Sequence, residues 1–139
     1  MDKQKVIEAL NEAMNLELEG GLEYLYLSFN VFGSTRRLLQ GFLREQAQEG
    51  IEHATKMAEK ITSLGGTPHL KVQADYKTDK LTTKGILERG MARERKALDL
   101  YKASLPLADG DVALEELLRS QVVAEQEHLE EVGKLLRES

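Results

Sequence analysis

The residues of this sequence best suited to chemistry are Glu125 and His128, which lie three positions apart in the stretch AEQEHLEEV. Three positions along a helix turn a side chain by about 60° around the axis, so both groups can reach one ion from the same side. A carboxylate and an imidazole suit cations of hard or borderline character. In a chain with 31% charged residues, however, a single pair of this kind is more often a solvated surface pair. The polar groups on other helical faces decide between these two interpretations.

Acidic residues and histidines interrupt helical stripes that should be apolar. Glu17 lies on a stripe with Leu10, Met14, Gly21, Tyr24 and Ser28. Glu94 lies on a stripe with Leu87, Met91, Leu98, Tyr101 and Leu105. His53 lies on a stripe with Leu39, Phe42, Leu43, Gln46, Gly50, Met57, Ile61 and Leu64. Glu125 and His128 share a stripe with Leu114, Leu118, Gln121, Val132 and Leu135. Because residues three or four apart face the same side of a helix, these polar groups are expected inside the protein.

Several buried carboxylates at one level of a helical bundle need compensation by cations, protons or metal, because an unpaired buried carboxylate is costly. A metal ion provides this compensation most directly. Glu125 and His128 can hold one ion from one side, and Glu17 and Glu94, from two other helices, can bridge two such ions. Together with His53, these residues occupy four inward faces and predict a metal site.

The two halves of the chain repeat this order of residues. Glu17 and Tyr24 recur with the same spacing as Glu94 and Tyr101. The chain has only four tyrosines and three histidines, and two of the histidines also superpose in the repeat. Leucine matches are common between helices, so the rarer residues carry the argument. The third histidine, His69, is expected in an exposed loop.

Composition places the chain among helical single-domain proteins. Its 139 residues, 41% of them hydrophobic, are expected to form one domain spanning 1–139. An aromatic content of 5% and two prolines favour helices over a sandwich or barrel. The lack of cysteine excludes disulfides and a thiolate metal site. A net charge of −5 disfavours nucleic-acid binding, and no apolar run is long enough for a signal peptide or membrane span, so the cytoplasm is the expected location.

Four helical periods are separated by breaking residues. The helices are expected from about Lys5 to Phe32, from a Ser34 cap to Leu64, from Thr82 or Thr83 to just before Pro106, and from an Asp111 cap nearly to Ser139. Short connections make antiparallel hairpins of helices one and two and of helices three and four. The long connection between helices two and three can extend about 60 Å, more than the length of a helix of about 45 Å. This pattern predicts an all-α fold, an antiparallel four-helix bundle with one long crossover between helices two and three.

With these motifs the chain resembles the ferritin-like di-iron superfamily, and it is most similar to the bacterioferritin and ferritin branch. The resemblance covers almost the whole chain and rests on Glu17 with Tyr24, on QEGIEHATKMAEKITSLGGTP, on MARERKAL and on AEQEHLEE. In that family two helices give one Glu each and the other two give a Glu-x-x-His each, and these residues hold two irons. The resemblance implies a ferritin-like fold and a di-iron centre on Glu17, His53, Glu94, Glu125 and His128.

One ligand position of the family differs in this chain. Three residues before His53 the family has Glu, whereas this chain has Gly50. Glu49, four residues before His53, either replaces that ligand or, as the resemblance implies for such positions, faces the inside of a shell and attracts iron. The haem-binding Met of bacterioferritins is Ile51 here, so no haem is expected.

The resemblance implies a ferroxidase that takes Fe(II) and O2 or peroxide, and stores or detoxifies iron in a homo-oligomer, either a shell or at least a dimer. Tyr24 and Tyr101 are expected near the site, where they hydrogen-bond ligands or supply an electron. Manganese stays an alternative to iron. Two other functions also stay open: a non-storage di-metal oxidase or peroxidase acting as a rubrerythrin-like dimer, and a metal-free helical interaction protein in which Gly50 marks decay of the site.

Overall fold

The computed structural model of the chain describes residues 1–77 and 81–137. These residues form four long α-helices and one short 3-10 helix: α1 Lys3–Phe29, α2 Arg36–Ser63, α3 Thr83–Ser104, η1 Leu105–Ala108 and α4 Val112–Leu136. The predicted all-α class is confirmed, while the predicted end of the last helix near Ser139 lies outside the described residues. Within the described ranges, no helix is both long and apolar enough to cross a membrane.

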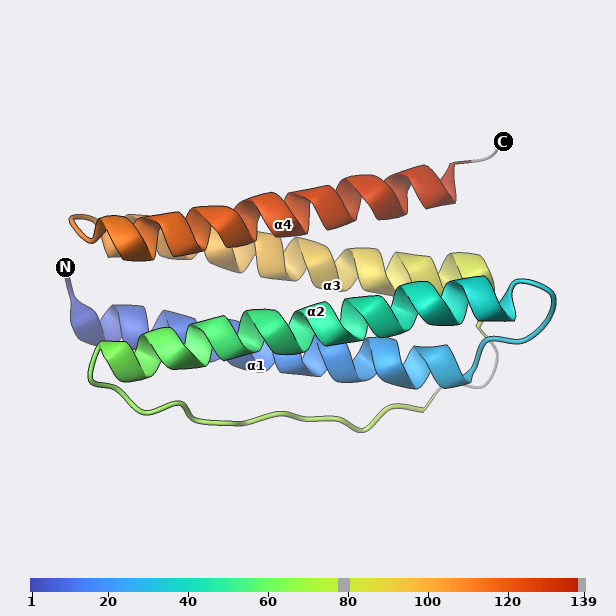
Figure 1. The fold of residues 1–139 in the computed structure, drawn as a ribbon, viewed down its shortest axis with the longest axis horizontal. Coiled ribbons are helices and arrows are strands. Elements are labelled where there is room, and N and C mark those ends of the chain that lie inside the picture. The colour runs from blue at the N-terminus through green and yellow to red at the C-terminus, as the bar shows by residue number, and fades with distance from the viewer. Residues whose placement is uncertain (78–80, 138–139) are drawn as a thin grey trace.

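The order and direction of the helices agree with the predicted topology. Figure 1 shows α1 and α2 as one antiparallel hairpin, and α3 and α4 as a second hairpin beside it. The described part of the connection after α2, residues 64–77, runs back along most of the first hairpin, and α2 and α3 point in the same direction (Figure 1). The antiparallel four-helix bundle with one long crossover is therefore confirmed.

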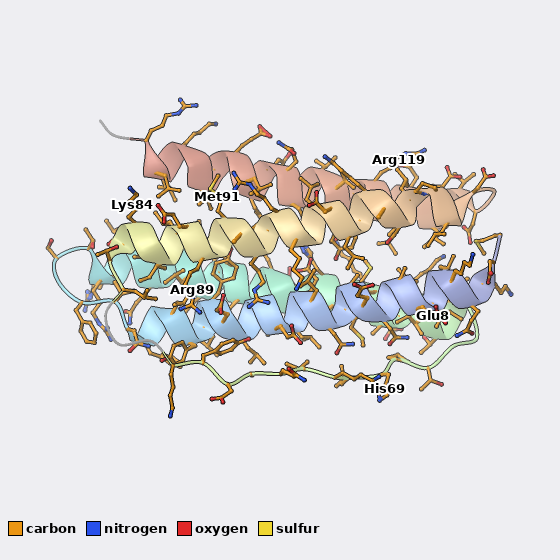
Figure 2. All side chains as sticks on the ribbon, turned by 180° about the vertical axis from the view of Figure 1, so that it is seen from behind. Glu8, His69, Lys84, Arg89, Met91 and Arg119 are labelled. Carbon is orange, nitrogen blue, oxygen red and sulfur yellow. The ribbon has the colours of Figure 1, made fainter. Side chains whose placement is uncertain are left out.

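Two asparagines on the outer face of α1 hold the crossover in place. The backbone N–H groups of His69 and Lys71 donate to the side-chain oxygens of Asn11 and Asn15, each at 2.7 Å. The Asn15 amide returns a hydrogen bond of 2.9 Å to the His69 carbonyl. These bonds satisfy backbone groups in a segment without regular structure. The His69 side chain is exposed, as predicted, and lies on the crossover outside the bundle (Figure 2).

Side-chain caps fix the starts of α3 and α4. Thr82 and Asp111 each accept a hydrogen bond of 3.0 Å from the backbone N–H three residues further on. Both starts match the prediction. The predicted Ser34 cap is wrong, because Thr35 occupies the cap position of α2 and makes no side-chain cap hydrogen bond. Ser34 lies instead in the turn, which the Arg36 N–H closes by donating to the Gly33 carbonyl at 3.2 Å.

The first helix ends at Phe29, three residues before the predicted end at Phe32. Asn30 explains the early end, because its side-chain amide donates to the Tyr26 carbonyl and its backbone N–H donates to the Leu27 carbonyl, each at 3.1 Å. Such local bonds of asparagine compete with continuation of a helix.

Two apolar clusters fill the bundle and leave a polar level between them. One cluster includes Leu10, Met14, Met57, Ile61, Leu114 and Leu118. The other includes Leu27, Leu39, Leu43, Ile86, Leu87 and Val132. On every helix the predicted inward polar residues lie between the members of these two clusters, namely Glu17, His53, Glu94, Glu125 and His128. The apolar packing therefore positions these side chains at one level.

The predicted inward stripes are largely confirmed, with one clear error at the end of α4. All six residues predicted on the stripe of α1 are buried. Leu135, by contrast, is 50% exposed, whereas Leu136 packs on the second apolar cluster. A straight helix drifts by about 20° per heptad relative to a seven-residue repeat, so the stripe has moved by one residue at this end.

Candidate metal centre

Both inward histidines turn their Nδ1 atoms toward carboxylates in the middle of the bundle. His53 Nδ1 lies 3.5 Å from Glu17 Oε2 and 3.3 Å from Glu125 Oε1. His128 Nδ1 lies 3.6 Å from both Glu94 Oε2 and Glu125 Oε2. The two rings are nearly parallel, with centroids 6.2 Å apart and an interplanar angle of 19°. The structure thus brings together all five inward polar residues that the sequence singled out.

These residues form two groups that share Glu125. One group is Glu17, His53 and Glu125, and the other is Glu94, Glu125 and His128. Within each group, one potential ligand atom of every residue lies within 4.8 Å of the others. Each group offers one imidazole nitrogen and two carboxylates, a donor set that suits iron, manganese or zinc. The arrangement can therefore hold two cations with one carboxylate between them.

Each outer glutamate accepts a hydrogen bond from a tyrosine of the other hairpin. The Tyr101 hydroxyl donates to Glu17 Oε1 at 2.9 Å, and the Tyr24 hydroxyl donates to Glu94 Oε1 at 2.8 Å. Both tyrosines lie near the site, as predicted, but each donates its hydrogen bond to the glutamate of the other repeat. These bonds leave the Oε2 atoms facing the histidines. Gly90 provides the space for this contact, since a Cβ at that position would lie 2.8 Å from the Tyr24 hydroxyl oxygen.

The side chain of Glu125 is buried without hydrogen bonds. The residue is 1% exposed, and neither of its carboxylate oxygens has a hydrogen-bond partner among the described residues. The same holds for His128 Nδ1 and for the Oε1 atom of Gln121. Buried polar atoms in proteins are nearly always satisfied, so these atoms need an explanation, above all Glu125 Oε2 and His128 Nδ1, which face each other. A cation fits it, because carboxylate oxygens and a neutral imidazole nitrogen are all metal ligands.

Proton affinities at the site reflect the same crowding of acidic and basic groups. Burial alone would lower the pKa of both histidines, but contacts with Glu125 and Glu17 raise the pKa of His53 to about 9. Contacts with Glu125 and Glu94 raise the pKa of His128 to about 11. Burial raises the pKa of Glu125 to about 8, against the opposing attraction of the histidines. Protons therefore compensate the buried carboxylates when no metal is bound.

Comparison with known proteins agrees with this geometry. The sequence profile of the ferritin family, described as a ferritin-like domain, matches residues 7–139. The chain belongs to the ferritin family. The resemblance predicted from the motifs is thereby confirmed, and it places the chain in an iron-binding family that includes bacterioferritins and non-heme ferritins.

Individual ferritin-family proteins match over most of the chain. A bacterioferritin of Brucella melitensis is 32% identical over 130 residues, which cover 91% of this chain and 79% of the relative. A crystal structure of ferritin-like, diiron-carboxylate proteins from Bacillus anthracis superposes with a TM-score of 0.85 at 28% identity, covering 99% of both chains. A bacterioferritin structure from Rhodobacter capsulatus with a metal-free dinuclear site superposes with a TM-score of 0.81 at 25% identity, covering 94% of this chain and 82% of that chain.

In this member of the ferritin family, position 50 faces the backbone of α1. A Cβ at Gly50 would lie 2.9 Å from the Glu17 carbonyl oxygen and 3.2 Å from the Gly21 Cα. A Cβ at Gly21 would lie 3.0 Å from the Ala47 carbonyl oxygen. The two glycines thus let α1 and α2 approach closely at the level of the site. The sequence placed Gly50 on the inward stripe of helix two and showed it as a departure from a ligand position, and Gly21 on the inward stripe of helix one was a signal of this contact.

Glu49 lies at the rim of the site and outside both ligand groups. Its Oε2 atom is 2.5 Å from His128 Nε2, on the edge of the ring away from Nδ1, and its side chain is 34% exposed. Arg93 was missed by the sequence analysis, but it lines the same pocket and pairs with Glu23 at 3.3 Å. Arginines usually lie on the surface, so nothing in the sequence indicated that Arg93 lines the pocket.

Replacing Gly50 with alanine is expected to destabilise the metal-free protein by about 1–3 kcal/mol, because an added methyl group in tight packing forces backbone shifts. Gly41 is the matched control, since it lies in the same helix and a Cβ there meets nothing within 4 Å. Alanine at position 41 is expected to stabilise the helix by up to about 1 kcal/mol. Thermal unfolding followed by circular dichroism measures both changes, and equal effects would contradict the close approach of α1 and α2.

Proposed function

We propose that this chain is a ferroxidase that binds Fe(II) inside the bundle, oxidises it with O2 or peroxide, and stores or detoxifies the ferric product in a homo-oligomeric shell. The observation that carries the proposal is the carboxylate of Glu125, whose two oxygens face the Nδ1 atoms of His53 and His128. A carboxylate in this position can bridge two cations, and paired ions suit redox chemistry that needs two electrons. The names of a bacterioferritin and of diiron-carboxylate proteins among the relatives support iron.

Five side chains are proposed as the ligands. Glu17 and His53 would hold one ion, Glu94 and His128 would hold the other, and Glu125 would be shared. Nitrogen and oxygen ligands without thiolate suit iron. When bound, two Fe(II) ions supply one electron each to peroxide, whose O–O bond breaks as it takes up protons and leaves as water.

Two tyrosines orient these ligands. Burial, reinforced by the neighbouring glutamates, raises the pKa of the Tyr24 and Tyr101 phenols, so both stay protonated as donors at neutral pH. Their hydrogen bonds fix the outer carboxylates with one oxygen toward each histidine. Electron donation by either tyrosine stays a prediction. Binding of Fe(II) requires His53, His128 and Glu125 to release the protons that they hold in the metal-free protein.

Assembly into a homo-oligomer is supported by apolar side chains on the outside of the first hairpin. Leu22, Leu25 and Phe29 are 40%, 37% and 53% exposed, and their spacing places them on one outer stripe of α1. Ile51, on α2, is 47% exposed. A stripe of exposed apolar residues such as the one on α1 is typical of protein–protein contacts.

Aerobic addition of Fe(II) followed by size-exclusion chromatography tests the proposal. A ferroxidase with a storage shell gives a prompt rise in ferric absorbance, and iron then co-elutes with a large oligomer. A dimer that holds about two metal ions per chain and forms no mineral indicates instead the non-storage oxidase or peroxidase. A protein that oxidises no Fe(II), and whose melting temperature Fe(II) does not change, refutes metal binding altogether.

Substitution of one ligand at a time tests the assigned roles. Glu94→Ala and His128→Ala are each expected to lower the initial rate of iron oxidation at least about tenfold, since loss of an outer partner of a ligand alone lowers metal affinity or activity about 10–100-fold. Far-ultraviolet circular dichroism should show little loss of helix. Glu131→Ala, on the exposed side of α4, is the control for loss of one acidic group and should oxidise iron normally. Full activity in Glu94→Ala or His128→Ala would count against the ligand assignment.

A further inference from the structure

We infer that Glu49 is a positioning residue for His128, which it holds from outside the metal centre, and that it is not a replacement for the ligand missing at Gly50. This inference rests on the proposed function, because it concerns an imidazole that the proposal assigns to the metal. It gives the carboxylate at the rim of the site a third role, distinct from direct ligation and from attraction of iron at the inner face of a shell.

The two nitrogens of the His128 ring have different partners. Nε2 lies 2.5 Å from Glu49 Oε2, whereas Nδ1 lies 3.6 Å from Oε2 of both Glu94 and Glu125. Nδ1 therefore faces the proposed ligands, while Nε2, on the other edge of the ring, pairs with the Glu49 carboxylate. With Nε2–H donating to Glu49, the lone pair of Nδ1 is directed inward, and the tautomer that can bind a metal is selected.

The Glu49 side chain is more exposed to solvent than the proposed carboxylate ligands of the same ion. The side chain of Glu49 is 34% exposed, compared with 1% for Glu125 and 9% for Glu94. Neither of the two potential ligand groups includes Glu49. Its oxygen contacts the outer nitrogen of the ring, where a metal-bound histidine usually donates to a carboxylate, a carbonyl or water.

The internal repeat shows that this contact is specific to one half of the site. Position 49 corresponds in the repeat to Ala124, just as Gly50 corresponds to Glu125. An alanine cannot provide the equivalent acceptor to His53, and among the described residues His53 pairs only with Glu17 and Glu125, in both cases through Nδ1. The close contact of Gly50 with α1 leaves no room for a carboxylate at position 50. The α2 helix reaches His128 from position 49, and within the described ranges His53 has no corresponding outer carboxylate.

Isothermal titration of the metal-free protein with Zn(II) alone tests the inference without any turnover. Glu49→Ala is expected to weaken binding of one of two Zn(II) ions about 10–100-fold, the usual effect of losing an outer partner of a ligand. Glu49→Gln is expected to recover most of this loss, because an amide oxygen still accepts from Nε2–H but is a poor substitute for a carboxylate ligand. Glu52→Ala, at an exposed position of α2, controls for the loss of one negative charge and should bind like the wild type.

A double-mutant cycle separates action through His128 from direct ligation. If Glu49 acts through the imidazole, Glu49→Ala has no further effect on Zn(II) affinity in a His128→Ala background. Additive losses, or a Glu49→Gln variant as weak as Glu49→Ala, would show direct ligation and overturn the inference. Wild-type affinity in Glu49→Ala would also overturn it, but would leave the proposed function intact. A wild-type protein that binds no Zn(II) would overturn both.

Discussion

Replacing Glu125 with alanine is expected to lower the initial rate of iron oxidation at least about 100-fold, because both ions lose a ligand together and even the loss of an outer partner lowers activity about 10–100-fold. No other residue of the described chain belongs to both potential ligand groups. Glu125→Ala should therefore lower the oxidation rate more than Glu94→Ala does, because Glu94→Ala removes a ligand from one group only. Stopped-flow absorbance after mixing with Fe(II) in air measures the rates, and a Glu125→Ala rate equal to that of Glu94→Ala would contradict a shared carboxylate.

Although Glu125 is needed for iron oxidation, its carboxylate should destabilise the fold of the metal-free protein. Burial raises the pKa of Glu125 to about 8, so its charged form destabilises the fold at alkaline pH. Glu125→Gln preserves the size of the side chain and removes that charge. We expect the metal-free variant to melt at least about 2 °C above the wild type near pH 9. A lower melting temperature would show that the carboxylate stabilises the bundle, as an ordinary structural residue does.

The second large effect is a loss of stability of the metal-free protein as the pH rises. The pKa values of His53 and His128 are raised from 6.5 to about 9 and about 11. Their stabilising contribution is fully present below pH 6.5 and is lost as the pH rises through these values. The pKa of Glu125 is raised from 4.5 to about 8, so its destabilising contribution grows as the pH rises from 4.5 to about 8 and is complete above that value. All three groups therefore predict a lower melting temperature at alkaline pH.

Zn(II) should reverse this trend. Because metal binding displaces the protons of these groups, Zn(II) binds more tightly as the pH rises. At about 100 times its dissociation constant a ligand stabilises the folded state by about 2.7 kcal/mol, so we expect Zn(II) to raise the melting temperature by at least about 5 °C near pH 8 and by less near pH 6. Calorimetric scans with and without Zn(II) measure the difference. A shift of the same size at both values of pH would exclude proton release from the site.

Much of the site follows from the sequence because it depends on local periodicity. A helix carries side chains to the same face every three or four residues, so Glu17, Glu94 and Glu125 could be placed inside from the apolar residues around them. The internal repeat then indicated that each hairpin contributes a glutamate and a histidine at matching positions, Glu17 and His53 from the first and Glu94 and His128 from the second. The chain direction followed in the same way, since only the connection between α2 and α3 is long enough to cross the bundle.

Other features depend on distances between helices, which periodicity does not contain. The clash at Gly50 exists only because the α1 backbone lies 2.9 Å from a Cβ placed there. The pairing of Tyr24 with Glu94, and not with Glu17 on its own helix, likewise depends on how the hairpins face each other. Glu49 has the same sequence environment whether it turns toward a metal or toward the outer edge of His128. The end of α1 was misplaced because the Asn30 side chain bonds to the helix backbone at the Tyr26 carbonyl, and the start of α2 was misplaced because Thr35 takes the cap position without a side-chain hydrogen bond that the sequence could indicate.

Anomalous diffraction at the iron edge from crystals soaked without oxygen in a ferrous salt tests the central claim most directly. We predict two peaks per chain inside the bundle, one beside Nδ1 of His53 and one beside Nδ1 of His128, with the Glu125 carboxylate between them. Tyr24 and Tyr101 should keep their hydrogen bonds to the outer glutamates. A bundle without iron peaks, with the inward glutamates turned toward solvent, would contradict the proposed metal centre.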